Sequence, residues 1–279
     1  MDLPRTRASL PRVEWLDSVG STNAALRDLL LREEGGLAHG ALVATAEQTS
    51  GRGRRDRGWT MPPDTALAIS VLIRDAGTGG LPVSWLPLLA GSAVTAALQP
   101  LFPPGRRVGL KWPNDVHVRD EEDALHGRPG LKLCGILCEA VPAGGDETAV
   151  VVGMGVNLLI PEWQLPSERA TSVLAAGGDV GGAESLADPA GRGLADRVLS
   201  GVAGELLRIV ELSRSDPDAA RRTVTRHSLT LGTEVRVHLP DARVVDGRAR
   251  ALDDDGALIV DLPTGGALTV TAADVEHLR

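Results

Sequence analysis

Aromatic residues are scarce in this chain of 279 residues, which has five tryptophans, one phenylalanine and no tyrosine. Tyrosine chemistry is therefore excluded, and stacking on a ligand ring falls mainly to a tryptophan. The core must be built from Leu, Val, Ile and Ala. The only cysteines are Cys134 and Cys138, too few for a disulfide framework or a four-cysteine zinc site. They are typical of small buried apolar residues.

Long apolar runs are also missing. The N-terminus lacks the apolar stretch of a signal peptide, and no run of about 18 apolar residues appears elsewhere. We therefore expect a cytoplasmic protein with no membrane partner. The formal net charge of −8 argues against a nucleic-acid-binding surface over the whole protein, because phosphate recognition needs clustered positive charge. Neither a Gly-x-Ser-x-Gly elbow nor a His-Glu-x-x-His motif occurs, so hydrolase and zinc interpretations lack support.

Apolar periodicity predicts an α+β fold in two domains. Strands are expected at 13–16, 41–46, 67–73, 108–118, 131–141 and 149–159, and helices at 23–34, 86–98, 196–212 and 217–227. Because strands and helices do not alternate strictly, we expect a mixed sheet rather than a doubly wound one. After residue 229, short alternating strands separated by turn clusters predict a small β-barrel. We place the domain boundary near 228, giving domains 1–228 and 229–279.

Four arginines lie within six residues in the segment GRGRRDRGW, residues 51–59. Arginine binds carboxylate and phosphate through paired hydrogen bonds, and glycine lets backbone N–H groups approach phosphate oxygens. An isolated run of this kind is most often a solvated loop or a nucleic-acid-binding segment. Here it lies between two predicted strands and ends in Trp59, which favours a loop that is mobile until a ligand orders it. It is not a Walker loop, since no Gly-Lys-Ser/Thr precedes a helix.

Two further segments conflict with their local pattern. KWPND, residues 111–115, interrupts a predicted strand with poor strand formers. Such conflicts are expected at functional sites, although an edge-strand bulge would give the same pattern. Strand alternation places Lys132 on one face with Cys134 and Ile136, where a lysine needs an anionic partner. Asp115 on the neighbouring strand is one candidate, and a ligand carboxylate is another.

Hydroxyl and glycine clusters complete the pattern. Ser21 and Thr22 precede a predicted helix, where they serve either as N-cap or as ligands for a polar head group. GMGVN, residues 153–157, follows an apolar run without the third glycine or the helix of a dinucleotide fold. Its glycines indicate close approach of backbone to a ligand, with Asn157 able to bind an adenine edge, or else a bulged core strand.

The order and spacing of these motifs resemble the biotin–protein ligase family. They are STN at 21–23, Gln48 with the arginine segment, KWPND, KLCGIL at 132–137 and GMGVN. The resemblance implies an α+β catalytic domain of the biotin/lipoate ligase type and a C-terminal SH3-like barrel. It implies that ATP, with Mg²⁺, activates biotin as biotinyl-5′-AMP, and that the product is transferred to a lysine of a biotin carboxyl carrier domain of biotin-dependent carboxylases. No DNA-binding segment precedes the motifs, so neither repression nor a nucleic-acid partner is expected.

The resemblance also assigns roles to residues. Ser21, Thr22, Asn23 and Gln48 would line the biotin head; Arg52, Gly53 and Arg54, with Gly51 in the same loop, would hold carboxylate and phosphate; Gly135 and Leu137 would supply backbone and wall. Asn114 and Asn157 would meet the nucleotide, and Trp59 would cover the adenine. Lys132 would bridge the carboxylate and the α-phosphate. Lys132 and Arg54 would thus be catalytic, with Asp115 orienting or deprotonating the incoming lysine.

The chain departs from the family pattern at two places. Asp56 stands where the family usually has glycine, which puts an acid inside the arginine segment. Residues 119–129 lengthen a connection that is normally short, and we expect a polar surface loop there. Two rival functions remain: a lipoate or octanoate ligase, which shares the fold class but is not expected to carry KWPND with this arginine segment, and a non-catalytic nucleic-acid-binding protein.

Overall fold

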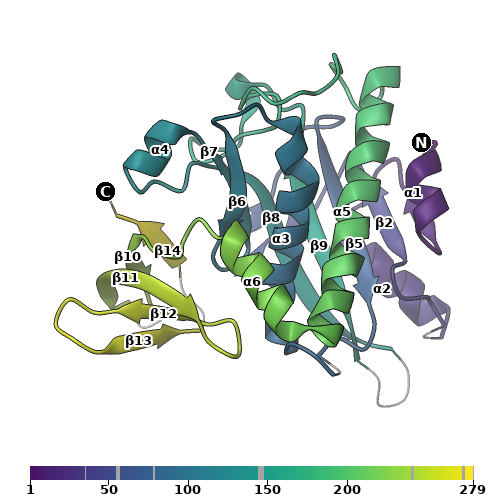
Figure 1. The fold of residues 1–279 in the computed structure, drawn as a ribbon. Coiled ribbons are helices and arrows are strands. Elements are labelled where there is room, and N and C mark those ends of the chain that lie inside the picture. The colour runs from purple at the N-terminus through teal and green to yellow at the C-terminus, as the bar shows by residue number, and fades with distance from the viewer. Residues whose placement is uncertain are drawn as a thin grey trace.

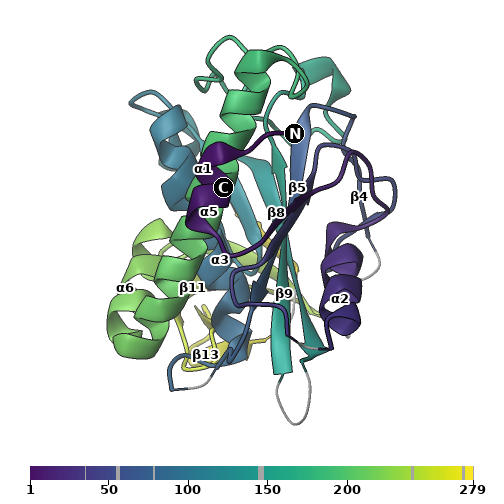
Figure 2. The ribbon, with the colours of Figure 1, turned by 90° about the vertical axis from the view of Figure 1, so that its right-hand side faces the viewer.

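The elements between residues 4 and 227 include a seven-stranded mixed sheet with helices on both faces (Figures 1 and 2). The computed structural model describes residues 1–34, 36–54, 57–77, 79–143, 148–239, 242–271 and 274–278. In sheet order, the strands are β1 (Val13–Trp15), β2 (Leu42–Thr45), β5 (Ala66–Ile73), β9 (Thr148–Asn157), β8 (Leu131–Pro142), β7 (Asp115–Arg119) and β6 (Arg107–Lys111). β1 and β2 pair in parallel, whereas the other neighbours pair antiparallel. The predicted α+β class is confirmed.

One face of the sheet is covered by α3 (Leu86–Leu98), α5 (Pro189–Ser215) and α6 (Pro217–His227), with α1 (Pro4–Ser9) packed on α5. The other face carries α2 (Thr22–Arg32), seen apart from those helices in Figure 2. Helix α3 approaches the sheet closely through small residues: a Cβ on its Gly91 would lie 2.3 Å from Leu110 Cδ1. Because α3, α5 and α6 all pack on the first face, the α2 face of the sheet is left open for a site.

The structure corrects three expectations about local elements. The single strand predicted at 108–118 is wrong, because KWPND forms the turn between β6 and β7 and contains a cis Trp112–Pro113 bond. The segment 119–129 is not all loop, since it contains α4 (Glu121–Leu125), capped by Asp120. Helix α5 begins before the predicted residue 196, because Asp188 caps it and Pro189 suits its first turn.

The C-terminal residues form a separate five-stranded antiparallel sheet beside β6 (Figure 1). In sheet order, the strands are β13 (Ala267–Val270), β12 (Leu258–Asp261), β11 (Val244–Leu252), β10 (Glu234–His238) and β14 (Asp274–His277). Apolar residues alternate into its core, as at Val235 and Val237. We did not predict β14. We propose the domain boundary near 228, in the segment between α6 and β10.

Indole groups join the two sheets. Trp85 Nε1 donates to the Asp254 carbonyl at 2.8 Å, and Trp112 Nε1 donates to the Gly256 carbonyl at 3.1 Å. Lys111 Nζ donates to the Val275 carbonyl at 2.7 Å. These bonds hold the C-terminal sheet beside the KWPND turn. Among the described residues, no helix is both long and apolar enough to cross a membrane.

Candidate active site

A cavity of about 770 Å³ opens on the α2 face of the main sheet. All but two of the residues predicted for the site line it. They are Ser21, Thr22, Asn23, Gln48, Arg52, Gly53, Arg54, Trp59, Asn114, Asp115, Lys132, Gly135 and Leu137. The structure therefore brings together motifs that are more than one hundred residues apart.

Gly51 and Asn157 lie outside this lining. Gly51 pairs with Trp59 in a short hairpin, where an added Cβ would lie 2.3 Å from the Trp59 carbonyl oxygen. Asn157 is 2% exposed, and its Nδ2 donates to the Thr171 carbonyl at 2.9 Å. That bond fastens the loop after β9 to the strand, so Asn157 is placed to support the site from behind rather than to line it.

One end of the cavity is polar and tightly bonded. Gln48 Oε1 accepts from the Thr22 backbone N–H at 2.9 Å and lies 3.2 Å from its hydroxyl. Gln48 thus satisfies the start of α2, while Ser21, at the N-cap position, makes no side-chain cap bond. Ser70 on β5, which is fully buried, donates to Asn23 Oδ1 at 2.6 Å and lies 2.8 Å from Thr22 Oγ1. Sequence analysis missed Ser70 because it lies in an unbroken apolar strand.

The floor of the cavity lacks side chains where β8 and β9 pair. Gly135 lies directly opposite Gly155 in the ladder, and the Trp59 ring lies on both. An added Cβ would be 2.3 Å from Trp59 at Gly155 and 3.0 Å at Gly135. At Gly153, it would be 2.2 Å from Asn23 Oδ1. These glycines are therefore required by the close approach of the Trp59 and Asn23 side chains. The approach of a ligand, which the sequence indicated at Gly153 and Gly155, stays a prediction.

Lys132 extends over this floor and pairs with Asp115, whose Oδ1 lies 2.8 Å from Lys132 Nζ. Asp115 is one of the two partners expected for this lysine, and the ligand carboxylate stays a prediction, but the predicted face of Lys132 is wrong. A β-bulge shifts the β7–β8 register between Val116 and His117, which turns Lys132 into the cavity while Cys134 stays in the core. Burial raises the pKa of the Cys134 thiol well above its usual range, consistent with an inert core residue.

The arginine segment forms a short hairpin, β3 (Gly51–Arg52) and β4 (Gly58–Trp59), at the cavity wall. Arg54 Nη1 donates to Asn114 Oδ1 at 3.1 Å, which links the hairpin to the KWPND turn. Arg52 lies 3.5 Å from Glu139, whose other oxygen accepts from Asn23 Nδ2 at 2.6 Å. Asp56, the departure noted in the sequence, lies outside the described residues. The expected mobility of the hairpin stays a prediction.

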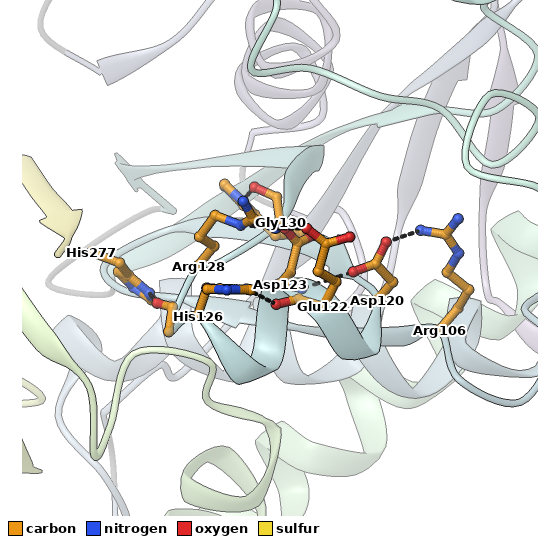
Figure 3. A network of polar contacts seen from close by, with 10 residues as sticks. Arg106, Asp120, Glu122, Asp123, His126, Arg128, Gly130 and His277 are labelled. Carbon is orange, nitrogen blue, oxygen red and sulfur yellow. Dashed lines mark hydrogen bonds and ion pairs between the residues drawn. The ribbon is translucent and has the colours of Figure 1, made fainter. Parts of the chain in front are cut away.

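The other end of the cavity is walled by residues that sequence analysis did not select. They are Lys111, His117, Pro129, Gly130, Leu131, Arg169, His238, Val275, Glu276 and His277. The inserted segment 119–129 reaches this wall through bonds within and beyond α4 (Figure 3). Arg128 bonds Asp123 at 2.8 Å and Glu122 at 3.2 Å, and His277 Nδ1 lies 3.3 Å from the Gly127 carbonyl oxygen. The insertion therefore connects the cavity rim to β14.

Comparison with known proteins gives a consistent result. Residues 15–157 match the biotin/lipoate A/B protein ligase family, and residues 230–278 match the biotin protein ligase C-terminal domain. The biotin–[acetyl-CoA-carboxylase] ligase of Mycobacterium tuberculosis is 37% identical over 269 residues, which cover 95% of this chain and 89% of that protein. The chain belongs to the biotin/lipoate A/B protein ligase family. The resemblance to biotin–protein ligases that the motifs indicated is confirmed.

Solved structures agree on the fold. The biotin protein ligase from Aquifex aeolicus, in complex with biotin and ATP, superposes with a TM-score of 0.68 at 23% identity, covering 96% of this chain and 100% of that one. The Leishmania major ligase in complex with biotinyl-5-AMP gives a TM-score of 0.55 at 24% identity, covering 94% and 99%. At these identities, the likeness establishes the shared architecture of both sheets.

Proposed function

We propose that this chain is an ATP-dependent ligase that activates biotin as biotinyl-5′-AMP and transfers it to a lysine of a biotin carboxyl carrier domain. The single observation that supports this best is the cavity itself. One end offers the fixed polar groups of Thr22, Asn23 and Gln48, and its centre offers Lys132 beside Asp115. A neutral polar head with a carboxylate tail, as in biotin, fits that order of groups.

In the first half-reaction, a biotin carboxylate oxygen attacks the α-phosphorus of ATP. A new P–O bond forms, the bond to the β-phosphate oxygen breaks, and pyrophosphate leaves with the electron pair. Lys132, Arg52 and Arg54 stabilise the charge that develops on the α-phosphoryl group, since fixed cations are most effective where water is excluded. Asn114 meets the nucleotide, and the Trp59 hairpin shields the anhydride from water.

In the second half-reaction, the neutral ε-amine of the carrier lysine attacks the biotinyl carbonyl carbon. The amide C–N bond forms, the carbonyl C–O bond to phosphate breaks, and AMP leaves with the electron pair. The proton released by the amine passes to Asp115 or to solvent. Because Asp115 Oδ1 is 2.8 Å from Lys132 Nζ, the group that orients the amine adjoins the group that binds the acyl phosphate.

Mg²⁺ enters this reaction with ATP. Across the described parts of the chain, no group of three or more His, Cys, Asp or Glu side chains could hold a metal ion. Phosphate oxygens and water would therefore supply most of its ligands, as Mg²⁺ prefers. When bound, the ion would offset charge on the leaving pyrophosphate.

The lipoate or octanoate alternative is disfavoured by the C-terminal sheet, which matches the biotin protein ligase C-terminal domain. The nucleic-acid alternative is disfavoured because the arginine hairpin lines a cavity with Lys132 and Asp115 instead of a flat surface. Neither rival explains why KWPND forms a turn that bonds Arg54.

The decisive experiment measures biotin-dependent exchange of pyrophosphate into ATP and then transfer of biotin to the host's own carrier domain. We expect wild-type protein to perform both steps and Lys132→Ala to lose at least about a hundredfold, since removing one positioned charge-stabilising donor costs that much. Arg222→Ala, at an exposed site on α6 outside the cavity lining, is the control. Exchange that depends on lipoate alone would overturn the proposal.

A further inference from the structure

His117 is a cavity residue with no part in the mechanism above. It lies on β7 two residues after Asp115, on the same face of the sheet, and directly opposite Lys132 in the β7–β8 ladder. The side chain is only 6% exposed, yet it lines the cavity. Its Nε2 atom is buried and has no hydrogen-bond partner among the described residues. A buried polar atom without a hydrogen-bond partner lowers the stability of the fold, unless a ligand in the cavity supplies the missing hydrogen bond.

The tautomer of this imidazole follows from its one bond. His117 Nδ1 lies 3.1 Å from the Gly130 carbonyl oxygen, which can only accept, so Nδ1 carries the hydrogen and Nε2 carries a lone pair. Burial, and then the nearby Lys111 charge, lower the pKa of His117 to about 3. The ring is therefore neutral at any physiological pH, and Nε2 is a fixed hydrogen-bond acceptor.

Because His117 Nε2 is a hydrogen-bond acceptor, the ligand group that lies next to it must be a donor. Phosphate oxygens are excluded because they are acceptors themselves. The ureido N–H groups of biotin belong at the Ser70 end of the cavity, three strand spacings or about 14 Å away. Asn114, which would meet the nucleotide, lies in the turn before β7 and bonds Arg54 and the Ile136 carbonyl, with Asp115 between it and His117 along the chain. The Lys132 ammonium is paired with Asp115, so the N–H donor left among the groups of the reaction is the amine of the acceptor lysine.

The shape of the cavity supports that occupant. His117 lies at the inner end of a rim formed by Leu131, Arg169 and Glu276, whose side chains are partly or largely exposed. This rim joins solvent to the Lys132–Asp115 pair, which is where a lysine from a separate protein must arrive. On the basis of the proposed function, we propose that His117 Nε2 accepts a hydrogen bond from the ε-amine of the acceptor lysine and positions it for the second half-reaction.

The surroundings favour a reactive amine there. The positive charges of Lys111 and Lys132 disfavour an ammonium group beside them, and the Asp115 carboxylate is placed to take its proton. One N–H of that amine then bonds Nε2 while its lone pair faces the biotinyl carbonyl. The imidazole takes no proton in this step. The proton released on attack still passes to Asp115 or solvent, so His117 orients the amine without serving as its base.

The test separates the two half-reactions. Adenylate formation is measured by pyrophosphate exchange, and transfer is measured as a single turnover from preformed enzyme–biotinyl-AMP to the carrier domain. For His117→Leu we expect exchange within about twofold of wild type, and transfer slowed about tenfold, or about 1.4 kcal/mol. The loss should appear in kcat and leave the KM for the carrier unchanged. His117→Gln, which can still accept, should recover part of the rate, and His126→Leu, on the exposed side of α4, should match wild type.

Unchanged transfer in His117→Leu overturns the inference. Equal losses in exchange and transfer also overturn it, because they assign His117 to the nucleotide or to folding. If the wild-type protein forms no adenylate, the proposed function is wrong, and that result is distinct from a failure of the role of His117.

Wild-type protein offers a measurement independent of these variants. The chain has only six histidines, so ¹⁵N-histidine labelling resolves the Nε2 signal. With an adenylate analogue whose carbonyl is replaced by methylene, adding carrier should shift the His117 Nε2 resonance, and a carrier with methionine at the acceptor position should not. Identical spectra with the two carriers contradict the contact.

Discussion

Ser70 does not line the cavity, yet its hydroxyl fixes two side chains that do. It donates to Asn23 Oδ1 and lies beside Thr22 Oγ1, and its side chain is fully buried. Ser70→Ala leaves a buried amide oxygen without its donor, which costs about 1–3 kcal/mol. We expect weaker biotin binding by about tenfold with little change in the KM for ATP, measured by calorimetry and pyrophosphate exchange. Ser200→Ala, on α5, is the control, and equal effects of the two variants would contradict this role.

The glycine floor makes a second prediction. Gly155→Ala places a Cβ 2.3 Å from the Trp59 ring, so the indole must move and the variant should lose about 1–3 kcal/mol of stability. Activity should fall with it. Gly204→Ala is the matched control, because its Cβ meets nothing within 4 Å in the middle of α5, and it should gain about 0.5–1 kcal/mol. Urea unfolding of both variants checks the difference in sign.

Acid should destabilise the protein through His277. Burial, and then the charge of Lys111, lower the pKa of His277 to about 4, so the folded protein keeps it neutral where the unfolded chain protonates it. The unfolded state therefore binds more protons, and the free energy of unfolding falls as pH drops from about 6.5 towards 4. His277→Leu should flatten this slope in urea unfolding measured across that range. A slope identical to wild type would be the contrary result.

Inserted helix α4 depends on its cap. Asp120 Oδ1 accepts from the Asp123 backbone N–H at 2.8 Å, and that bond, more than the Arg106 charge, lowers the pKa of Asp120 (Figure 3). Asp120→Ala should cost about 1 kcal/mol locally, seen as faster amide exchange across α4. Glu121→Ala, one residue later and exposed, should leave the exchange rates unchanged. If Asp120→Ala does not speed amide exchange across α4, the Arg128 bonds alone hold this helix in place.

Strong periodicity predicted most elements of the main sheet and its helices correctly. Two of the errors, at KWPND and at Lys132, fall where the course of a strand changes within one or a few residues. KWPND was taken as part of a strand because the apolar positions on both sides fit one strand, and only pairing in space reveals a turn. The bulge beside Lys132 has no signature in sequence, since alternation across KLCGIL is regular on paper. Ser70 was missed because it is the single polar residue of an apolar strand, and His117 was missed because it lies just outside the KWPND motif.

Two indole hydrogen bonds, together with the bond from Lys111 to β14, join the two sheets of different size. Trp85 donates to the Asp254 carbonyl and Trp112 donates to the Gly256 carbonyl, both in the turn between β11 and β12. Trp112→Phe leaves the Gly256 carbonyl unpaired and should lower stability by about 1–3 kcal/mol, with the C-terminal sheet unfolding first. Calorimetry should then show a separate low-temperature transition. Trp163→Phe, at an 80% exposed site, should unfold as wild type does. A single unshifted transition in Trp112→Phe would mean that the sheets are joined by other contacts.

The scarcity of aromatic residues gives the molecule a built-in optical probe. Of the five tryptophans, Trp85 and Trp112 are sealed between the sheets, Trp163 faces solvent and Trp15 lies on β1. Only Trp59 lies in the cavity, on the glycine floor and 5.8 Å from Lys132 Nζ. With no tyrosine to transfer excitation, a change in emission on adding biotin or ATP would come chiefly from this one ring. Occupancy of the site can therefore be followed in the native protein without a label.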